Sequence, residues 1–135
     1  MSSEFPAAVP EIPVRNVDEA AAYYRDVLGF NVDWGGEDGG IGAISRGHSR
    51  MFLTSRTFRE AHGNAAPVVV WLNLDSNTDV DALHDAWKRS GAKIVSPPES
   101  KPWGLREFTV ADLDGNLFRV FHDFGTAGRS GKASS

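Results

Sequence analysis

The sequence predicts an α+β fold built from two units with the same order of elements: strand, helix and three strands. The pattern of the first half starts again near residue 67. In both halves a stretch with apolar residues three or four positions apart is followed by a glycine, as is typical of an amphipathic helix and its end. Residues 55–66 between the halves are polar, lack this spacing and are interpreted as a linker. Two units of roughly 60 residues indicate a duplicated module rather than a solenoid.

The first unit, about residues 8–55, opens with a short apolar segment bounded by prolines, residues 9–14, which is predicted to be a strand. Asn16 and Asp18 mark a helix start, because an Asn side chain caps helix amides and a carboxylate suits the positive helix end. Gly29 ends this helix. Three strands follow between glycine-rich or polar turns, over residues 30–34, 41–45 and 50–54.

The second unit, about residues 67–124, repeats this order. Residues 68–74 are predicted to be a strand, and Thr78 is predicted to cap a helix that Gly91 ends. Three strands complete the unit over residues 93–96, 105–111 and 117–122, the last two joined by a hairpin turn at residues 112–116. We expect residues 1–124 to form one domain and residues 125–135, rich in Gly, Ser and Ala, to be a disordered tail.

Composition excludes several classes of function. The 135 residues include no cysteine, which rules out disulfide scaffolds, thiolate metal sites and cysteine nucleophiles. The net charge of −4 and the scattered Lys and Arg residues argue against nucleic acid as a partner. No apolar run is long enough to span a membrane, and the N-terminus lacks the pattern of a signal peptide. A soluble, cytoplasmic protein is therefore expected.

Alternation along the strands predicts two different sheet faces. Residues 68, 70, 72 and 74 are all aliphatic and suit a core, whereas Trp71 and Asn73 share the opposite face. A core has no need of Asn73, so this second face is interpreted as the wall of a ligand cavity. The same alternation places further side chains on such faces: Val9, Glu11, Phe52, Thr54, Glu107, Leu117, Arg119 and Phe121.

The four tryptophans divide into two groups. Trp87 lies on the apolar stripe of the second helix and is predicted to be a core residue. Trp34, Trp71 and Trp103 fall on cavity faces or at strand ends, where an indole ring can stack on a planar ligand or attract a cation. Packing at a dimer interface explains them equally well, and both interpretations stay open.

Glu11 and Arg119 are charges on the predicted cavity faces, where buried charges are usually paired. Two interpretations have equal weight: an ion pair between them, or an Arg119 that binds an anionic group of a ligand. The complete predicted ligand-binding set has aromatic and cationic walls and a polar fringe: Trp34, Phe52, Trp71, Trp103, Arg119, Glu11, Thr54, Asn73 and Glu107.

Two stretches carry a resemblance to a known family. EIPVRNVDEAAAYYRDVLGF and PWGLREFTVADLDGNLFRVF resemble the signature stretches of the glyoxalase, bleomycin-resistance and ring-cleavage-dioxygenase superfamily, which has the vicinal oxygen chelate fold. The resemblance covers residues 9–124, and the second stretch is more similar to the bleomycin-resistance branch. It implies two βαβββ modules whose curved mixed sheets form a shared cavity, commonly in a homodimer.

The resemblance also provides a test for metal chemistry. Enzymes of the superfamily bind a divalent metal through His, Gln or Glu on the concave sheet faces. The matching positions here are Val9, Val69 and Arg119, which cannot ligate a divalent ion. The four histidines share no spacing that suggests another site. We therefore expect no metal, no cofactor and no catalysis.

The function implied is that of a metal-free antibiotic-binding protein of the bleomycin-resistance type. Such a protein sequesters a planar or cationic ligand, for instance a bleomycin-type glycopeptide, in a cleft at the dimer interface. Trp34 falls where bleomycin binders have a stacking aromatic residue, and Glu37 and Asp38 follow it in the next loop. Two alternatives remain: a metal-dependent enzyme similar to glyoxalases, thiol transferases or dioxygenases, and a module whose concave faces are filled by the partner chain.

Overall fold

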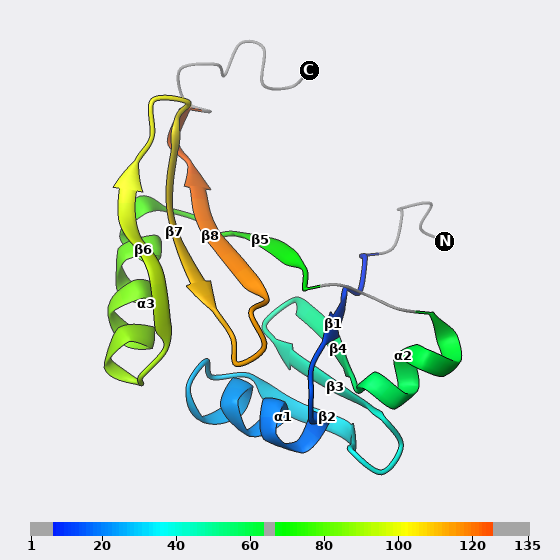
Figure 1. The fold of residues 1–135 in the computed structure, drawn as a ribbon. Coiled ribbons are helices and arrows are strands. Elements are labelled where there is room, and N and C mark those ends of the chain that lie inside the picture. The colour runs from blue at the N-terminus through cyan, green and yellow to red at the C-terminus, as the bar shows by residue number, and fades with distance from the viewer. Residues whose placement is uncertain (1–6, 64–66, 126–135) are drawn as a thin grey trace, which may run out of the picture.

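The computed structural model describes residues 7–63 and 67–125, and it contains two four-stranded mixed sheets (Figure 1). The first sheet has the strand order β1-β4-β3-β2 and the second has the order β5-β8-β7-β6. In each sheet the first strand of the unit pairs in parallel with the last, and the other pairs are antiparallel. This repeated connectivity confirms the predicted α+β fold of two βαβββ modules. The predicted tail lies outside the described residues from residue 126 onward.

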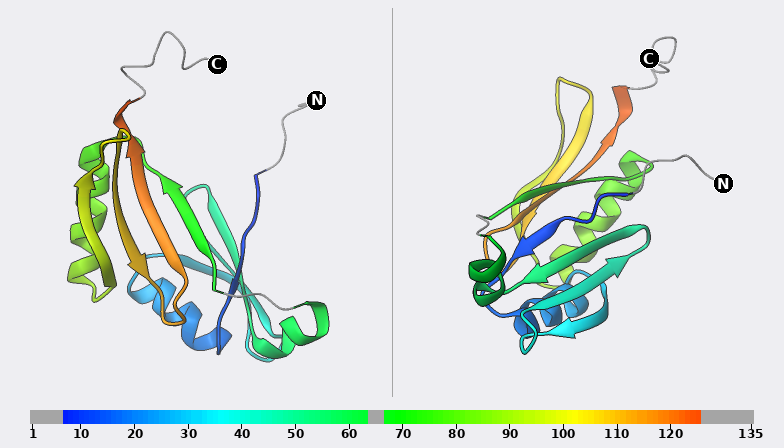
Figure 2. Two further views of the ribbon diagram at one scale, coloured as in Figure 1. Left: turned by 45° about the horizontal axis from the view of Figure 1, so that its top comes forward. Right: turned by 90° about the vertical axis from the view of Figure 1, so that its right-hand side faces the viewer.

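The elements of the first module are β1 (Glu11–Pro13), α1 (Val17–Asp26), β2 (Asn31–Gly36), β3 (Ile41–Arg46) and β4 (Ser49–Thr54). Those of the second are β5 (Val69–Asn73), α3 (Asn77–Arg89), β6 (Lys93–Ser100), β7 (Leu105–Ala111) and β8 (Leu117–Asp123). α1 lies against the first sheet and α3 against the second (Figures 1 and 2). No helix among the described residues is long and apolar enough to cross a bilayer.

The helix starts follow local capping chemistry. Asn16 caps α1 as predicted, because its side chain accepts a hydrogen bond from the amide of Glu19 at 2.8 Å. The cap of α3 is Ser76 rather than the predicted Thr78, since the Ser76 hydroxyl accepts from the amide of Asp79 at 3.0 Å. The helix therefore begins at Asn77, before the predicted cap.

The predicted linker contains a helix, α2 (Arg56–His62). Ser55 caps it by accepting a hydrogen bond from the amide of Phe58 at 3.2 Å. None of its side chains is fully buried, so it has no apolar stripe that periodicity could reveal. Strand β6 is also longer than predicted: it continues through Pro97 and Pro98 to Ser100, and its pairing with β7 contains register shifts between Ile94 and Glu99.

One hydrophobic core joins the two modules. Tyr24 of α1 packs edge-on against Phe30 of its own module and Phe118 of β8, with ring centroids 5.5 and 5.9 Å apart. Trp87 of α3 is 3% exposed, as expected for a core residue, and its indole N–H donates to the carbonyl of Leu28 at 3.0 Å. Both helices therefore contribute to the same core.

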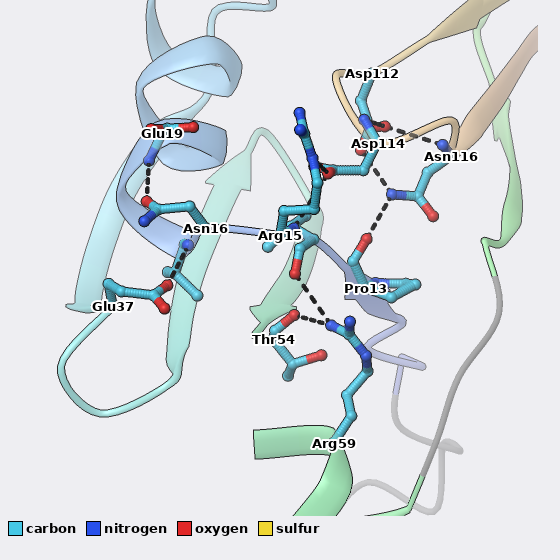
Figure 3. A network of polar contacts seen from close by, with 12 residues as sticks. Pro13, Arg15, Asn16, Glu19, Glu37, Thr54, Arg59, Asp112, Asp114 and Asn116 are labelled. Carbon is cyan, nitrogen blue, oxygen red and sulfur yellow. Dashed lines mark hydrogen bonds and ion pairs between the residues drawn. The ribbon is translucent and has the colours of Figure 1, made fainter. Parts of the chain in front are cut away.

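A network of polar contacts connects the hairpin turn of the second module to the first module (Figure 3). The Asn116 amide donates to the carbonyl of Pro13 at 2.9 Å and to Asp112 at 2.8 Å, and its oxygen accepts from the amide of Val68 at 2.9 Å. Asp112 also accepts from the Tyr24 hydroxyl at 2.8 Å. The hydrogen bonds from Asn116 to Pro13 and from Tyr24 to Asp112 are buried and link the two modules.

Candidate functional site

An aromatic cluster occupies the open face of the first sheet. The register aligns Glu11, Phe52, Ala43 and Trp34 in one row across β1, β4, β3 and β2. Trp34 is 44% exposed, and its ring lies 5.5 Å from that of Phe52. The guanidinium carbon of Arg50 lies 5.3 Å from the Phe52 ring, within reach of a cation–π interaction. We call Trp34, Phe52 and Arg50 the first cluster.

Thr54 is at a different depth from its predicted neighbours. It is 0% exposed, and its hydroxyl donates to the carboxylate of Glu11 at 2.9 Å. The chain therefore buries Thr54 and leaves Glu11 exposed at the sheet edge. Alternation placed Thr54 on the correct side of the strand, but its hydroxyl is already engaged and it does not line an open surface.

A second cluster lies on the open face of the second sheet. Trp71 of β5, Arg119 of β8 and Thr109 of β7 are aligned in one row. The guanidinium carbon of Arg119 lies 5.6 Å from the Trp71 ring centroid, and its Nη1 donates to the Thr109 hydroxyl at 3.1 Å. Trp71 is 49% exposed and meets the ring of Phe121 edge-on at 5.5 Å. We call Trp71, Arg119, Thr109 and Phe121 the second cluster.

The next row contains Asn73, Phe121 and Glu107. Glu107 is only 8% exposed, and its carboxylate accepts a hydrogen bond from the indole N–H of Trp103 at 3.2 Å. Trp103 follows β6 in the turn before β7 and is 58% exposed. Glu107 therefore orients Trp103 instead of lying open to solvent, whereas Asn73 remains exposed.

Glu11 and Arg119 belong to different sheets, and no ion pair joins them. Each is held by a threonine, Glu11 by Thr54 and Arg119 by Thr109. The Glu11–Arg119 ion pair that one interpretation predicted is therefore not formed in this structure. The sequence analysis assigned no role to Thr109. Its position two residues from Glu107, on the same face of β7, could have identified it as a residue of the binding face.

The two clusters meet at a seam between β4 and β5. Within the described ranges no hydrogen bond or ring contact joins them directly. A pocket of about 290 Å³ at this seam is lined by Arg50 from the first cluster and Trp71 from the second. A larger pocket of about 550 Å³ also includes Trp71 and lies between β5, α3 and the β3–β4 turn. Its walls include Arg46 and Leu83, which alternation along the strands did not identify.

The donor set does not fit a divalent metal. Val9 and Val69 are exposed aliphatic residues, and Arg119 is a cation, so none of the three positions offers a lone pair to an ion. In the part of the chain that the structure describes, no three His, Cys, Asp or Glu side chains are grouped to hold a metal. His62 and His122 contact the backbone carbonyls of Phe58 and Leu74 at 3.0 Å.

Comparison with known proteins identifies the family. The family model of the glyoxalase/bleomycin resistance protein/dioxygenase superfamily matches residues 7–120, and the chain belongs to this superfamily. No curated protein matches the chain.

Solved structures share the fold at low identity. A bleomycin-binding protein from bleomycin-producing Streptomyces verticillus, solved with copper(II)-bleomycin, is 26% identical over 88% of this chain and 97% of its own, with a TM-score of 0.67. TioX from Micromonospora sp. ML1 is 23% identical over 87% of this chain and 99% of its own, with a TM-score of 0.72. Lactoylglutathione lyase from Agrobacterium tumefaciens is 18% identical over 88% and 95%, with a TM-score of 0.74.

Proposed function

We propose that this protein is a metal-free binding protein that sequesters a planar or cationic small molecule, in the manner of a bleomycin-resistance protein. The observation that carries the proposal is the exposure of Trp34, Trp71 and Trp103, which leave 44, 49 and 58% of their surface open. Large apolar side chains gathered on open sheet faces are typical of binding surfaces. Indole rings suit stacking on flat ligands.

The similarity to the bleomycin-binding protein of Streptomyces verticillus supports an antibiotic as the ligand, and with it a role in antibiotic resistance. That protein is similar along nearly its whole length. Bleomycin and related glycopeptides are therefore the first ligands to test. The complete absence of cysteine suits a reducing compartment, and we place this activity in the cytoplasm.

Nothing in the site favours the enzymatic alternative. Enzymatic members of the superfamily depend on a metal, and Val9, Val69 and Arg119 leave the corresponding positions without donors. Lactoylglutathione lyase shares the fold at 18% identity, which carries no argument about chemistry. The proposal therefore excludes turnover and requires saturable binding alone.

The test compares ligand binding and stability in four variants. Trp34→Ala and Trp71→Ala should each weaken binding of bleomycin, or of the best planar compound from a thermal-shift screen, by about 1 kcal/mol, roughly fivefold, through lost stacking. Leu113→Ala is the matched control, because Leu113 is an exposed apolar residue in the hairpin turn, away from both clusters. Trp87→Ala should instead lower the free energy of unfolding by about 3–5 kcal/mol, because it opens a core cavity.

Tryptophan fluorescence and calorimetry measure the binding, and urea unfolding measures stability. Equal affinities for wild type, Trp34→Ala and Trp71→Ala would refute the site. One divalent ion per chain in purified protein, measured by elemental analysis, together with turnover of a thiol adduct would favour the enzymatic alternative.

A further inference from the structure

We infer that the second cluster is a receptor for the anionic group of a planar ligand, so that the ligand class includes aromatic carboxylates. The inference rests on the proposed function and specifies its ligand. Its basis is the position of Arg119, a partly buried cation at the centre of an open sheet face.

Arg119 is held in place from two sides. Its Nη1 donates to Thr109, which is itself buried, and its guanidinium carbon lies 5.6 Å from the ring of Trp71. Trp71 is in turn supported by the edge of Phe121. An arginine fixed in this way loses little further side-chain freedom when it binds an anion.

The charge of Arg119 has no carboxylate partner among the described residues. Arg15, Arg25, Arg56 and Arg106 each form an ion pair, and Arg46 and Arg59 donate to backbone carbonyls. Arg119 has neither kind of contact among the described residues, and its hydrogen bond to Thr109 uses only one of its five N–H groups. The carboxylate of Glu107, one row away on the same sheet face, accepts a hydrogen bond from Trp103 through Oε2. The remaining donors can form the paired hydrogen bonds that a carboxylate accepts.

Two arginines, Arg46 and Arg50, lie near Trp71 although the whole chain carries a net charge of −4. The seam pocket beside Trp71 is lined by Arg50 and His48 and by no carboxylate, and the larger pocket includes Arg46 and Asp79. Arg119 lines neither of these pockets and itself supplies the positive charge for an anion, and the exposed indole of Trp71 beside it provides a flat surface for an attached ring.

Matched probes that differ only in charge test the inference: naphthalene-2-carboxylate, naphthalene-2-carboxamide and 2-naphthylmethylammonium, titrated by calorimetry. Wild type should bind the carboxylate about tenfold more tightly than the amide, a typical effect of a charged hydrogen bond. High salt should reduce this preference. Arg119→Gln should abolish it by weakening the carboxylate alone, and Arg119→Lys should retain part of it. Arg89→Gln is the control, because it removes the same charge from the exposed end of α3.

Each result has a distinct consequence. If all three probes bind wild type equally, the anion receptor is refuted and the proposed function stands. If the preference exists but survives in Arg119→Gln, Arg119 is not the receptor. If none of the probes binds wild type, the inference is refuted, whereas the proposed function is decided separately by the titrations with bleomycin and the tryptophan variants. Should Arg119→Gln fail to fold, the comparison of the three probes on wild type and on Arg119→Lys decides the question.

Discussion

At the scale of single residues, Tyr24 shows how burial couples to charge. Its ring is fully buried between the modules, and its hydroxyl donates to Asp112 at 2.8 Å. Desolvation raises the pKa of the Tyr24 hydroxyl well above its usual value, and the adjacent Asp112 carboxylate raises it further. In the fold this tyrosine therefore stays protonated at a pH at which an exposed tyrosine ionises.

This shift has a definite sign. Because the pKa of Tyr24 is raised in the folded state, its contribution to stability is fully present below the unfolded pKa of about 10 and is lost as the pH rises through the folded pKa. Tyr24→Phe should lower the free energy of unfolding by about 1–2 kcal/mol at neutral pH, because Asp112 loses a donor. Above about pH 10 the variant should lose less further stability than wild type.

Urea unfolding at neutral and strongly alkaline pH measures both effects. Tyr23→Phe is the comparison at neutral pH, since Tyr23 is only partly buried and donates to the carbonyl of Ala111 over 3.3 Å. Burial raises the pKa of Tyr23 as well, so the alkaline effect is judged on wild type and Tyr24→Phe. Parallel losses of stability in wild type and Tyr24→Phe on raising the pH would contradict this assignment.

At the scale of elements, the β7–β8 hairpin turn connects the modules. Asn116 is 0% exposed and joins three backbone or side-chain groups: the carbonyl of Pro13, the amide of Val68 and the carboxylate of Asp112. A smaller side chain at this position would leave the Pro13 carbonyl and the Val68 amide without this partner, whereas Asp112 would keep its hydrogen bond from Tyr24. The turn therefore contributes to the packing of the two sheets as well as to the hairpin itself.

We expect Asn116→Ala to lower the free energy of unfolding by about 3 kcal/mol, since a buried group left without a partner costs about 1–3 kcal/mol. Asp114→Asn is the matched control in the same turn. It weakens the ion pair with the exposed Arg15, and such surface pairs contribute about 0–1 kcal/mol. Chemical denaturation measures the free energy of unfolding of both variants. Equal losses of stability in the two would contradict a larger contribution from the Asn116 hydrogen bonds.

The elements also show where sequence patterns are informative. Side-chain capping by Asn16 identified the start of α1 because the signal is local. The same chemistry left α3 ambiguous, since Ser76 and Thr78 are both capping residues and only the backbone geometry selects Ser76. Helix α2 was missed because its side chains remain outside the core and follow no apolar period.

At the scale of the whole molecule, the open faces of both sheets predict self-association. Trp34 and Trp71 lie on different sheets, and of the two only Trp71 lines the seam pocket, so a single chain leaves both rings exposed. A second copy would supply an opposite wall to each of them. We therefore propose a homodimer whose clefts combine the two clusters, and exposed apolar surface of this kind favours it.

Sedimentation equilibrium should give twice the chain mass of 14.6 kDa at micromolar concentration. Trp34→Arg should shift the equilibrium toward the monomer, because it places a charge on the apolar face, whereas Leu113→Arg in the hairpin turn should leave it unchanged. A wild-type protein that sediments as a monomer would contradict the dimer. The sheet faces of a single chain would then have to bind the ligand without a partner chain.

Sequence by itself determined the repeated order of elements, the core position of Trp87 and the open faces that carry Trp34 and Trp71. These follow from local spacing, because the side-chain period of a helix or strand fixes the face on which a residue lies. The tertiary structure alone decided depth and partnership. It buried Thr54 against Glu11, committed Glu107 to Trp103 and left Arg119 without a carboxylate partner among the described residues. Alternation cannot predict such outcomes, because depth and hydrogen-bond partners depend on strand register and on neighbours distant in sequence.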